Sequence, residues 1–343
     1  MQGKKRYGGR ERSNDEGQGR SQEESNDRQV SKMRDKDVSD YGKGLVSDFF
    51  GSNRSPKLFF TKIILGCLVF LNIVAWFIVW DLAQPKFLEV VFFDVGQGDA
   101  TFIETPQRIQ ILIDGGPSSV ILEKLAKEMP FYDRTIDLII LTHPEKDHLF
   151  GLLEVLKKYK IKNILWTGVV KDTAEFQEWR NLINKEGAKI IMAQAGQQID
   201  IGLAQGGPIL LDILNPSEDL EGQEFKDSND TSIVADLVFK DVSFLFTGDI
   251  TEKVEKKLNV DSDILKVAHH GSKTSSSPEF LKKVSPDIAI ISVGENKYGH
   301  PSPEVLANLE NFGIKTLITK ELGDIKIISD GEKYGISNSK NQN

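Results

Sequence analysis

All five histidines of this chain fall in three short polar motifs between residues 143 and 300. Imidazole and carboxylate groups at such spacing are the usual nitrogen and oxygen ligands of Zn, Mn and sometimes Fe. The single cysteine, Cys67, lies in an apolar run, so the chain can form neither a disulfide nor a thiolate zinc site. The motifs therefore predict a metal site of His and carboxylate ligands, which is typical of a metal-dependent hydrolase.

The densest motif is Leu-Thr-His-Pro-Glu-Lys-Asp-His at residues 141–148. It follows the apolar run 137–142, a predicted strand, and so forms the loop at the end of that strand. Four potential ligands fall within six residues: His143, Glu145, Asp147 and His148. Asp147 could instead cap a helix that starts near Leu149, but a helix cap leaves both histidines unexplained.

Two further predicted strands lead into potential ligands. The run 242–247 ends in Gly-Asp249, whose carboxylate can bridge two metals or simply form a turn. The run 263–268 ends in His269-His270. Because adjacent side chains of an extended chain point opposite ways, we expect one of these histidines to meet a metal and the other to face substrate or lie behind the ligands. The sequence leaves open which does so, and a pair of ordinary histidines is the alternative.

Loops near these motifs supply the expected substrate contacts. The turn Asp94-Val-Gly-Gln-Gly-Asp99 has glycines that let backbone amides approach an anion, and Asp114 opens a second Asp-Gly-Gly turn. We expect Asp94 and Asp114 to orient ligand histidines from behind, although either turn can be purely structural. His300 precedes a predicted helix and can contact a phosphate, act as an acid or be a solvated loop residue. The expected substrate contacts are Gln97, Asp99, Asn229, Asp230, Ser272, Lys273 and His300, and the expected catalytic groups are Asp147 and His300.

The elements that must position these residues lie in residues 87–335, where β-rich runs alternate with amphipathic helical stretches. The predicted strands are 88–94, 109–113, 137–142, 162–166, 188–192, 233–239, 242–247, 263–268, 287–292 and 315–319. The predicted helices are 119–129, 149–160, 173–186, 251–258, 278–284 and 303–313. This alternation predicts a layered α/β domain. Since strand after strand ends in His or Asp, the loops at one edge would bring these side chains together.

Polar and apolar segments flank this domain. Residues 1–57 are too polar to form a core and are expected to be disordered, as is the C-terminus from 336 to 343. Residues 58–82 contain an apolar stretch of about 20 residues, which predicts a transmembrane helix rather than a buried soluble helix or a cleaved signal peptide. More Lys and Arg precede the span than follow it, so we expect a single-pass cell-membrane protein with a cytoplasmic N-terminus and an external C-terminal domain.

The net charge of −8 argues against a globally basic surface for nucleic acid, although a local basic patch remains compatible with it.

The segments FFDVGQGDA, ILIDGG, LTHPEKDH, NDTS, FTGD and HHGSKTSSSPEF together resemble the metallo-β-lactamase superfamily. Within it they are most similar to the C-terminal hydrolase domain of the ComEC family of DNA-uptake channel proteins, over about residues 87–330. The superfamily signature His-x-His-x-Asp-His here has Glu145 at its second histidine, where the ComEC type usually carries a carboxylate. The resemblance implies a four-layered αββα sandwich with a dinuclear site at one edge.

By this resemblance, His143 and Glu145 would hold one metal and Asp147 and His148 the other. Asp249 would bridge them, and His269 or His270 would complete the ligand shell of the second metal. Where lactamases place a further histidine, this chain has Asn229-Asp-Thr-Ser232, so the site is richer in oxygen. The implied cofactors are two divalent metal ions, Mn or Zn, with the oxygen ligands favouring Mn.

The resemblance implies a membrane-anchored phosphodiesterase or nuclease that uses a metal-activated hydroxide, with DNA as a possible substrate. The alternatives are a hydrolase of another anionic ester, such as a choline phosphoester of the envelope, and a degenerate, tethered binding module. Glu145 and Asn229 make β-lactam hydrolysis a poor fit. The channel region of the ComEC family is not in this sequence, so we expect a free-standing relative that does not import DNA by itself. No protein partner can be inferred.

Overall fold

A computed structural model describes residues 56–83, 87–204 and 207–340. The chain divides into two compact units, Met1–Gln84 and Pro85–Asn343. The expected disorder of residues 1–57 falls almost wholly outside the described residues, as does that of 341–343.

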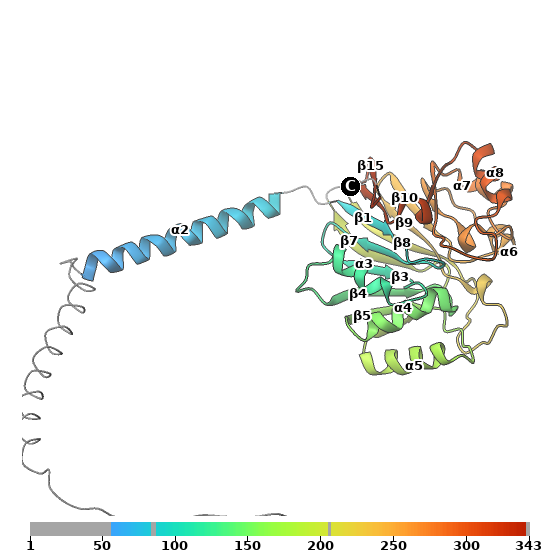
Figure 1. The fold of residues 1–343 in the computed structure, drawn as a ribbon, viewed down its shortest axis with the longest axis horizontal. Coiled ribbons are helices and arrows are strands. Elements are labelled where there is room, and N and C mark those ends of the chain that lie inside the picture. Colours follow the sequence, from blue (N-terminus) through green and yellow to red (C-terminus); the bar gives the residue numbers. More distant parts are fainter. Residues whose placement is uncertain (1–55, 84–86, 205–206, 341–343) are drawn as a thin grey trace, which may run out of the picture. The chain divides into compact units, whose positions relative to one another are not determined.

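The first unit contains helix α2 (Pro56–Ala83), which matches the predicted span (Figure 1). Its segment Lys57–Trp80 is the one helix of the described residues that is long and apolar enough to cross a membrane. The side chain of Asn72 donates a 2.9 Å hydrogen bond to the carbonyl oxygen of Leu68. This bond lies within the helix and partly satisfies the polar side chain without any other partner, as a lipid environment requires.

The second unit consists of two mixed β-sheets packed face to face. The eight-stranded sheet contains, in spatial order, β15 (Tyr334–Asn338), β14 (Ile325–Ser329), β1 (Leu88–Phe92), β2 (Thr101–Glu104), β3 (Gln110–Ile113), β4 (Thr135–Leu141), β5 (Lys160–Trp166) and β6 (Lys189–Met192). The seven-stranded sheet contains β13 (Lys315–Ile318), β12 (Ile288–Ile291), β11 (Ile264–Lys266), β10 (Val242–Phe246), β9 (Val234–Phe239), β8 (Gly207–Asn215) and β7 (Gln198–Ala204). The runs β3–β6 and β10–β13 are parallel, and the remaining neighbours are antiparallel.

Helices cover both outer faces of this sandwich. The helices are α3 (Val120–Glu128), α4 (Lys146–Leu156), α5 (Ala174–Glu186), α6 (Glu252–Glu255), α7 (Pro278–Val284), α8 (Pro303–Asn311) and α9 (Thr319–Leu322). Helices α3, α4 and α5 lie on one side of the paired sheets, and α6, α7 and α8 lie on the other (Figure 1). The fold is thus the predicted four-layered αββα sandwich.

Three buried apolar clusters hold these layers together. The largest lies between the two sheets, where Phe92 and Phe246 have ring centroids 6.1 Å apart. The second packs α3, α4 and α5 on the first sheet and contains the fully buried Trp179. The third packs the C-terminal helices on the second sheet. Strands that contribute side chains to two clusters are buried on both faces, so their sequences read as continuous apolar runs.

Several elements differ from the sequence prediction. Five strands were not predicted (β2, β7, β8, β14 and β15), and these lie in antiparallel parts of the sheets. Strand β15 extends through Asn338, so residues 336–338 are paired with β14 instead of being disordered. Helix α4 begins at Lys146, with Glu145 at its N-cap, so Asp147 lies in the first turn and is not the cap.

Candidate metal centre

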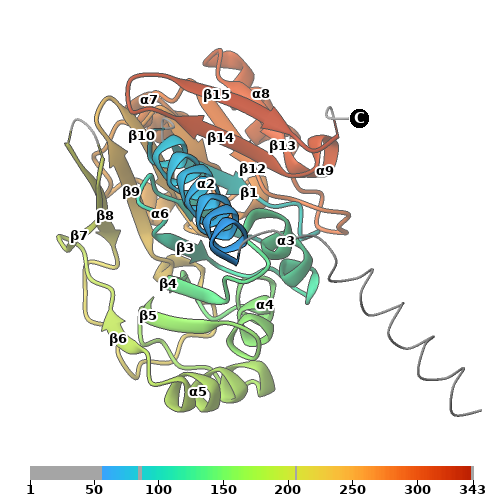
Figure 2. The same ribbon diagram turned by 90° about the vertical axis from the view of Figure 1, so that its left-hand side faces the viewer.

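The ends of parallel strands in both sheets deliver the predicted ligands to one edge of the sandwich. Strands β3 and β4 are parallel neighbours and are followed by Asp114 and His143. In the second sheet β10 and β11 are parallel neighbours and lead to Asp249 and His270. Figure 2 shows β3, β4 and β5 side by side next to helix α4, which carries His148 in its first turn. Carboxyl ends of parallel strands are the usual place for sites in layered α/β folds.

Hydrogen bonds fix the orientation of His143 through a chain of two donors. The Thr142 hydroxyl donates to Asp114 Oδ2 at 2.7 Å and lies 3.1 Å from His143 Nδ1. Since the single hydroxyl proton is used on Asp114, the hydroxyl oxygen accepts from Nδ1–H of His143. The Nε2 atom of His143 then carries a free lone pair.

His148 and His270 are held in the same tautomer. His148 Nδ1 donates to Asp114 Oδ2 at 2.8 Å, and His270 Nδ1 donates to the carbonyl oxygen of Ser292 at 2.9 Å. Acceptors behind a ligand histidine orient the ring and raise its basicity toward a metal. Both rings therefore direct Nε2 into the same space, where a metal ion can replace the proton on this atom.

These nitrogen atoms converge with the carboxylate of Asp249. Asp249 Oδ2 lies 3.3 Å from His148 Nε2 and 3.5 Å from His270 Nε2. Within the described residues, the Nε2 atoms of His143, His148 and His270 and Oδ1 of Asp249 are buried without a hydrogen-bond partner. Buried polar atoms that lack partners are costly, and a divalent cation coordinated by them removes that cost. The residues present thus fit a metal ion.

Four sets of ligand atoms lie close enough to share an ion, and two of these sets do not contain Asp99. One is His143, His148 and Asp249, and the other is Asp147, His148 and His270. His148 belongs to both sets, which differs from the implied division into a His143–Glu145 pair and an Asp147–His148 pair. Asp147 Oδ2 lies 3.4 Å from His270 Nε2, so Asp147 faces the cluster.

One carboxylate oxygen of Glu145 is bound by two neighbouring side chains. Its Oε1 accepts a hydrogen bond from Ser228 Oγ at 2.7 Å and pairs with Lys171. Glu145 lines the small cavity at the site but belongs to none of the clustered ligand sets of the described residues. The structure therefore places Glu145 beside the centre and gives its carboxylate an internal cation.

Asp99, expected to contact substrate, lies instead behind the ligands. Its Oδ1 is 3.2 Å from His270 Nδ1, and its other oxygen pairs with Lys266. Asp99 and Asp114 approach the Nδ1 atoms of His270 and His148, so both carboxylates are placed to orient these rings. Asp99 also belongs to two of the clustered ligand sets, and Asp114 to one. Asp94, which was expected to orient a ligand histidine, accepts a hydrogen bond from the amide of Gly96 and contacts no histidine.

His269 and His270 do not sit on an extended strand. Both have left-handed backbone conformations, with φ of 51° and 54°, in a short 3-10 segment after β11. His270 is 1% exposed and points into the cluster, whereas His269 Nε2 is 4.0 Å from Asp249 and faces the cavity. The two histidines thus face different surroundings, as the prediction of different roles requires. The cause is the turn that they form, and not the alternation of side chains along a strand.

Some of the predicted substrate contacts line the cavity at the cluster, and the others do not. Gln97, Asn229 and His300 line a cavity of about 240 Å³ at the cluster, together with His269. Asp230 instead accepts hydrogen bonds from the amide and hydroxyl of Thr251, at the start of α6. The remaining two, Ser272 and Lys273, follow the histidine turn but are absent from the residues that line the described cavities.

Opposing charges control protonation in the cluster. Burial lowers the pKa of His143 to about 3, so this ring is neutral. Burial also opposes the charged form of His270, but the carboxylates of Asp249 and Asp99 raise its pKa to about 10. Although burial favours protonation of Asp249, the adjacent His270 and His148 hold its pKa well below the usual range. The carboxylates that favour a proton on Nε2 equally favour a metal cation in its place.

Lys266 belongs to the centre but was not predicted from the sequence. Its side chain is 3% exposed, and its amine pairs with Asp99 and donates to the carbonyl oxygen of Gly248 at 3.2 Å. The signal was present in the sequence, because a lysine inside the apolar run 263–268 must find a partner when it is buried. Thr142 was likewise overlooked, although it directly precedes His143.

The αββα fold and the His/Asp cluster at its edge define a metal-dependent hydrolase fold. The model of the metallo-beta-lactamase superfamily matches residues 93–295, and the chain belongs to this superfamily. Two competence proteins are similar to it: ComE operon protein 3 of Bacillus subtilis, 31% identical over 265 residues, and competence protein ComA of Neisseria gonorrhoeae, 31% identical over 245 residues. Each match covers 69% of this chain and 32% of the relative, so the chain spans about a third of their length. The predicted relationship to the ComEC family is confirmed.

Among solved structures, the metallo-beta-lactamase fold protein YhfI of Bacillus subtilis matches with a TM-score of 0.50 at 14% identity. The match covers 71% of this chain and all of YhfI. At this identity the likeness shows the fold alone, and it agrees with the two-sheet architecture described above.

Proposed function

We propose that this protein is a metal-dependent phosphodiesterase that acts on nucleic acid and is anchored to the membrane by α2. The observation that carries the proposal is the convergence of three buried Nε2 atoms that lack hydrogen-bond partners and Asp249 beside an open cavity. The names of the competence relatives favour DNA among the phosphodiesters.

The side chains divide the work between holding the metal and handling the substrate. Divalent ions bound here would act as Lewis acids toward a phosphoryl group and would activate water. Asp114 and Asp99 keep the ligand rings in place, and Asp249 and Asp147 supply the negative charge that retains cations. His300 lies on the rim, its ring centroid 5.5 Å from that of His269, where its ring N–H can donate a hydrogen bond to a phosphoryl oxygen.

The test uses the full chain in detergent, loaded with Mn or Zn. We expect hydrolysis of bis(p-nitrophenyl) phosphate and of DNA, and no hydrolysis of the β-lactam nitrocefin. Metal content measured on the same samples should be at least one ion per chain. A chain that binds metal but cleaves no phosphodiester would contradict the proposal, and a chain that binds no metal would favour a tethered binding module.

Two variants connect the activity to the cluster. His148→Ala should abolish both metal binding and hydrolysis, because this histidine belongs to both of the ligand sets without Asp99. Asp230→Asn is the matched control, since Asp230 bonds to Thr251 outside the cluster. Unchanged hydrolysis in His148→Ala would show that the activity comes from elsewhere.

The membrane arrangement is part of the proposal. The excess of Lys and Arg before α2 favours an external catalytic domain. Protease added to intact cells should then digest residues 85–343, whereas digestion only after permeabilisation would place the domain inside.

A further inference from the structure

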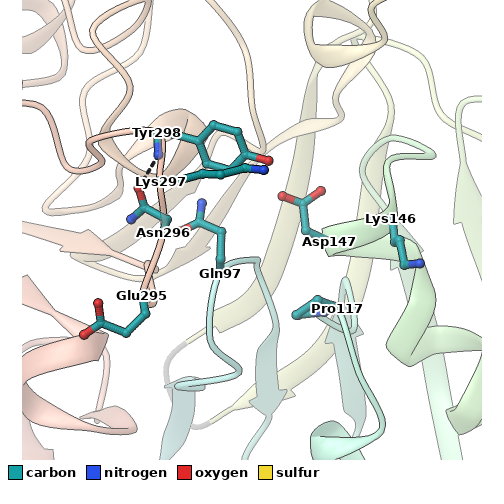
Figure 3. A pocket seen from close by; sticks show the side chains of 8 residues that line it. All are labelled: Gln97, Pro117, Lys146, Asp147, Glu295, Asn296, Lys297 and Tyr298. Atoms are coloured by element: carbon teal, nitrogen blue, oxygen red, sulfur yellow. Dashed lines mark hydrogen bonds between the residues drawn. The ribbon is translucent and has the colours of Figure 1, made fainter.

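A second pocket, larger than the cavity at the cluster, opens beside it (Figure 3). Its volume is about 680 Å³. The two hollows share Gln97, Asp147 and Tyr298, so a ligand at the cluster can continue into the larger pocket. Figure 3 shows Tyr298 and Lys297 on one side of this pocket and Asp147 and Pro117 on the other.

Tyr298 presents an open aromatic face at the junction of the two hollows. Its side chain is 67% exposed, so the ring can meet a ligand without any rearrangement. Its ring centroid lies 5.8 Å from that of His300, which in turn lies 5.5 Å from that of His269. A row of rings therefore leads from the cluster to the second pocket.

The side chain of Asn296 holds this loop in shape. Its amide donates to the carbonyl oxygens of Gly294 and His300, at 3.0 and 2.7 Å. Its Oδ1 accepts from the backbone amides of Tyr298 and His300, at 3.0 and 3.1 Å. Tyr298 is thus presented by a backbone that is ordered before any ligand arrives, which lowers the entropic cost of binding.

The loop is also fixed against the glycine turn that bears Gln97. The amide of Gly294 approaches Gln97 Oε1 at 3.4 Å, and a Cβ on Gly294 would lie 2.3 Å from the backbone of Gly96. Residue 294 must therefore be glycine, and this contact holds the loop that bears Tyr298 against the turn that bears Gln97.

The charge beside Tyr298 selects the kind of ligand. Lys297 is exposed and has no ion-pair partner among the described residues. In contrast, Lys146 turns its amine away from the pocket toward Glu175 Oε1, at 2.9 Å (Figure 3). A single ring with a free cation beside it suits an aromatic group next to an anion. It disfavours a quaternary ammonium head, which needs a cage of rings without a competing cation.

We propose that this pocket binds the nucleotide next to the scissile phosphate, with its base stacked on Tyr298 and a neighbouring phosphate paired with Lys297. This inference rests on the proposed phosphodiesterase function. Bases stack on aromatic side chains with little regard to sequence, but only when they are unpaired. The pocket therefore makes single-stranded nucleic acid the preferred substrate over duplex.

Three substrates separate the steps of this proposal when the full chain is assayed in detergent with Mn or Zn. Methyl p-nitrophenyl phosphate has no group that reaches the second pocket and reports the chemistry alone. An oligothymidylate and an oligomer of equal phosphate count that lacks bases differ only in stacking. We expect kcat/KM for the oligothymidylate to exceed that for the base-free oligomer by about tenfold, which lies within the range for base stacking on a protein ring.

Tyr298→Ala should remove this tenfold preference, measured as the ratio of kcat/KM for the oligothymidylate to kcat/KM for the base-free oligomer. Tyr298→Phe should restore the preference, because the ring is retained. Tyr132→Ala is the matched control, since Tyr132 is 75% exposed in the loop before β4, apart from both hollows. If Tyr298→Ala slows both oligomers equally or neither, or if duplex DNA is cleaved faster than single strands, the subsite is overturned.

Lys297→Ala tests the phosphate contact by its salt dependence. The slope of log(kcat/KM) for the oligothymidylate against log salt should become shallower by about 0.7, the value for one contact to a single strand. Lys158→Ala, at an exposed lysine near the end of α4, should leave the slope unchanged. An unaltered slope in Lys297→Ala would contradict the phosphate contact. If wild-type protein fails to hydrolyse even the methyl ester, the proposed function itself falls and the subsite falls with it.

Discussion

The carboxylate of Asp114 contacts two different groups of the centre, since its Oδ2 accepts from His148 Nδ1 and from the Thr142 hydroxyl. Through these bonds it sets the ring orientation of both His148 and His143. Metal affinity therefore depends on the acceptor behind these rings, and acceptors in this position are commonly worth about 10-fold to 100-fold in affinity.

Asp114→Asn should weaken metal binding by about 10-fold to 100-fold, because the neutral amide removes the negative charge behind His148 and its NH₂ group must face a donor, such as the Thr142 amide that Oδ1 accepts. Competition with a chromophoric chelator measures the affinity. Asp94→Asn is the control, because Asp94 also follows a strand of the first sheet, β1, but its carboxylate accepts from the backbone amide of Gly96 instead of from a histidine. Equal affinities for both variants and wild type would refute the assigned role of Asp114.

The buried pair of Asp99 and Lys266 predicts a stability change. Lys266→Met leaves the Asp99 carboxylate without its cation, and breaking a buried pair in this way costs about 3–5 kcal/mol. The double variant Asp99→Asn with Lys266→Met should recover part of that free energy of unfolding, because no lone charge remains buried. Denaturant titration followed by near-UV circular dichroism checks both values, and additive losses would argue against the pairing.

At the scale of elements, α4 depends on a glycine contact with the loop after β3. The amide of Gly115 donates to the carbonyl oxygen of His148 at 2.8 Å, and a Cβ on Gly151 would lie 1.8 Å from the carbonyl oxygen of Gly115. This close approach places the first turn of α4, with His148, against Asp114. Because both positions are glycine, α4 can pack close enough to the loop to hold His148 in the orientation that a metal ligand needs.

Gly151→Ala should destabilise the fold by about 1–3 kcal/mol, despite the better helix propensity of alanine, because the helix must move away from the loop. It should also weaken metal binding, since His148 moves with the helix. Gly335→Ala in β15, where a Cβ meets open space, is the control for both measurements. A stable variant with normal metal affinity would show that α4 is not held at this contact.

Strand β9 carries a carboxylate whose protonation changes stability. Burial, together with the nearby carboxylates of Asp212, Asp261 and Asp263, raises the pKa of Asp236 to about 7. Between about pH 4 and pH 7 the folded state keeps a proton that the unfolded chain releases. The stability contributed by this group is therefore present at low pH, is lost as pH rises through this window and stays level above it.

Asp236→Asn keeps a neutral side chain at every pH and should be more stable than wild type at pH 8. The gain should be up to about 4 kcal/mol, at about 1.4 kcal/mol per pKa unit, and should shrink toward zero near pH 4. Unfolding free energies of both proteins across this range provide the test. A difference that does not change with pH would rule out the raised pKa.

The same strands explain which parts of the fold could be predicted from sequence. Parallel strands buried on both faces, such as β4 and β10, read as apolar runs and were found with nearly correct ends. The β7–β8 hairpin alternates exposed and buried residues and includes Pro208, so its pattern is weak over short windows. Ligand motifs were recognised because they follow apolar strands, whereas Lys266 and the partners of Glu145 depend on contacts between segments far apart in sequence.

The whole molecule combines a candidate membrane helix with a hydrolase domain. Leu68→Lys with Ile73→Lys introduces two charges into α2, each costing about 2.5–3.5 kcal/mol at the centre of a bilayer. The wild-type chain should remain in the membrane fraction after alkaline carbonate extraction, and this variant should not. Leu203→Lys, at an exposed apolar residue of the domain, should behave like wild type. Release of the wild-type chain by carbonate would exclude an integral anchor.

The ligands of the centre come from two distant stretches of chain, His143 to His148 in the first half and Asp249 to His270 in the second. A nascent polypeptide that stops short of residue 270 therefore carries an incomplete set of metal ligands. Activity must await synthesis of the second sheet and its docking on the first, which occurs long after α2 has left the ribosome. A chain that is still being made thus cannot yet carry out metal-dependent hydrolysis.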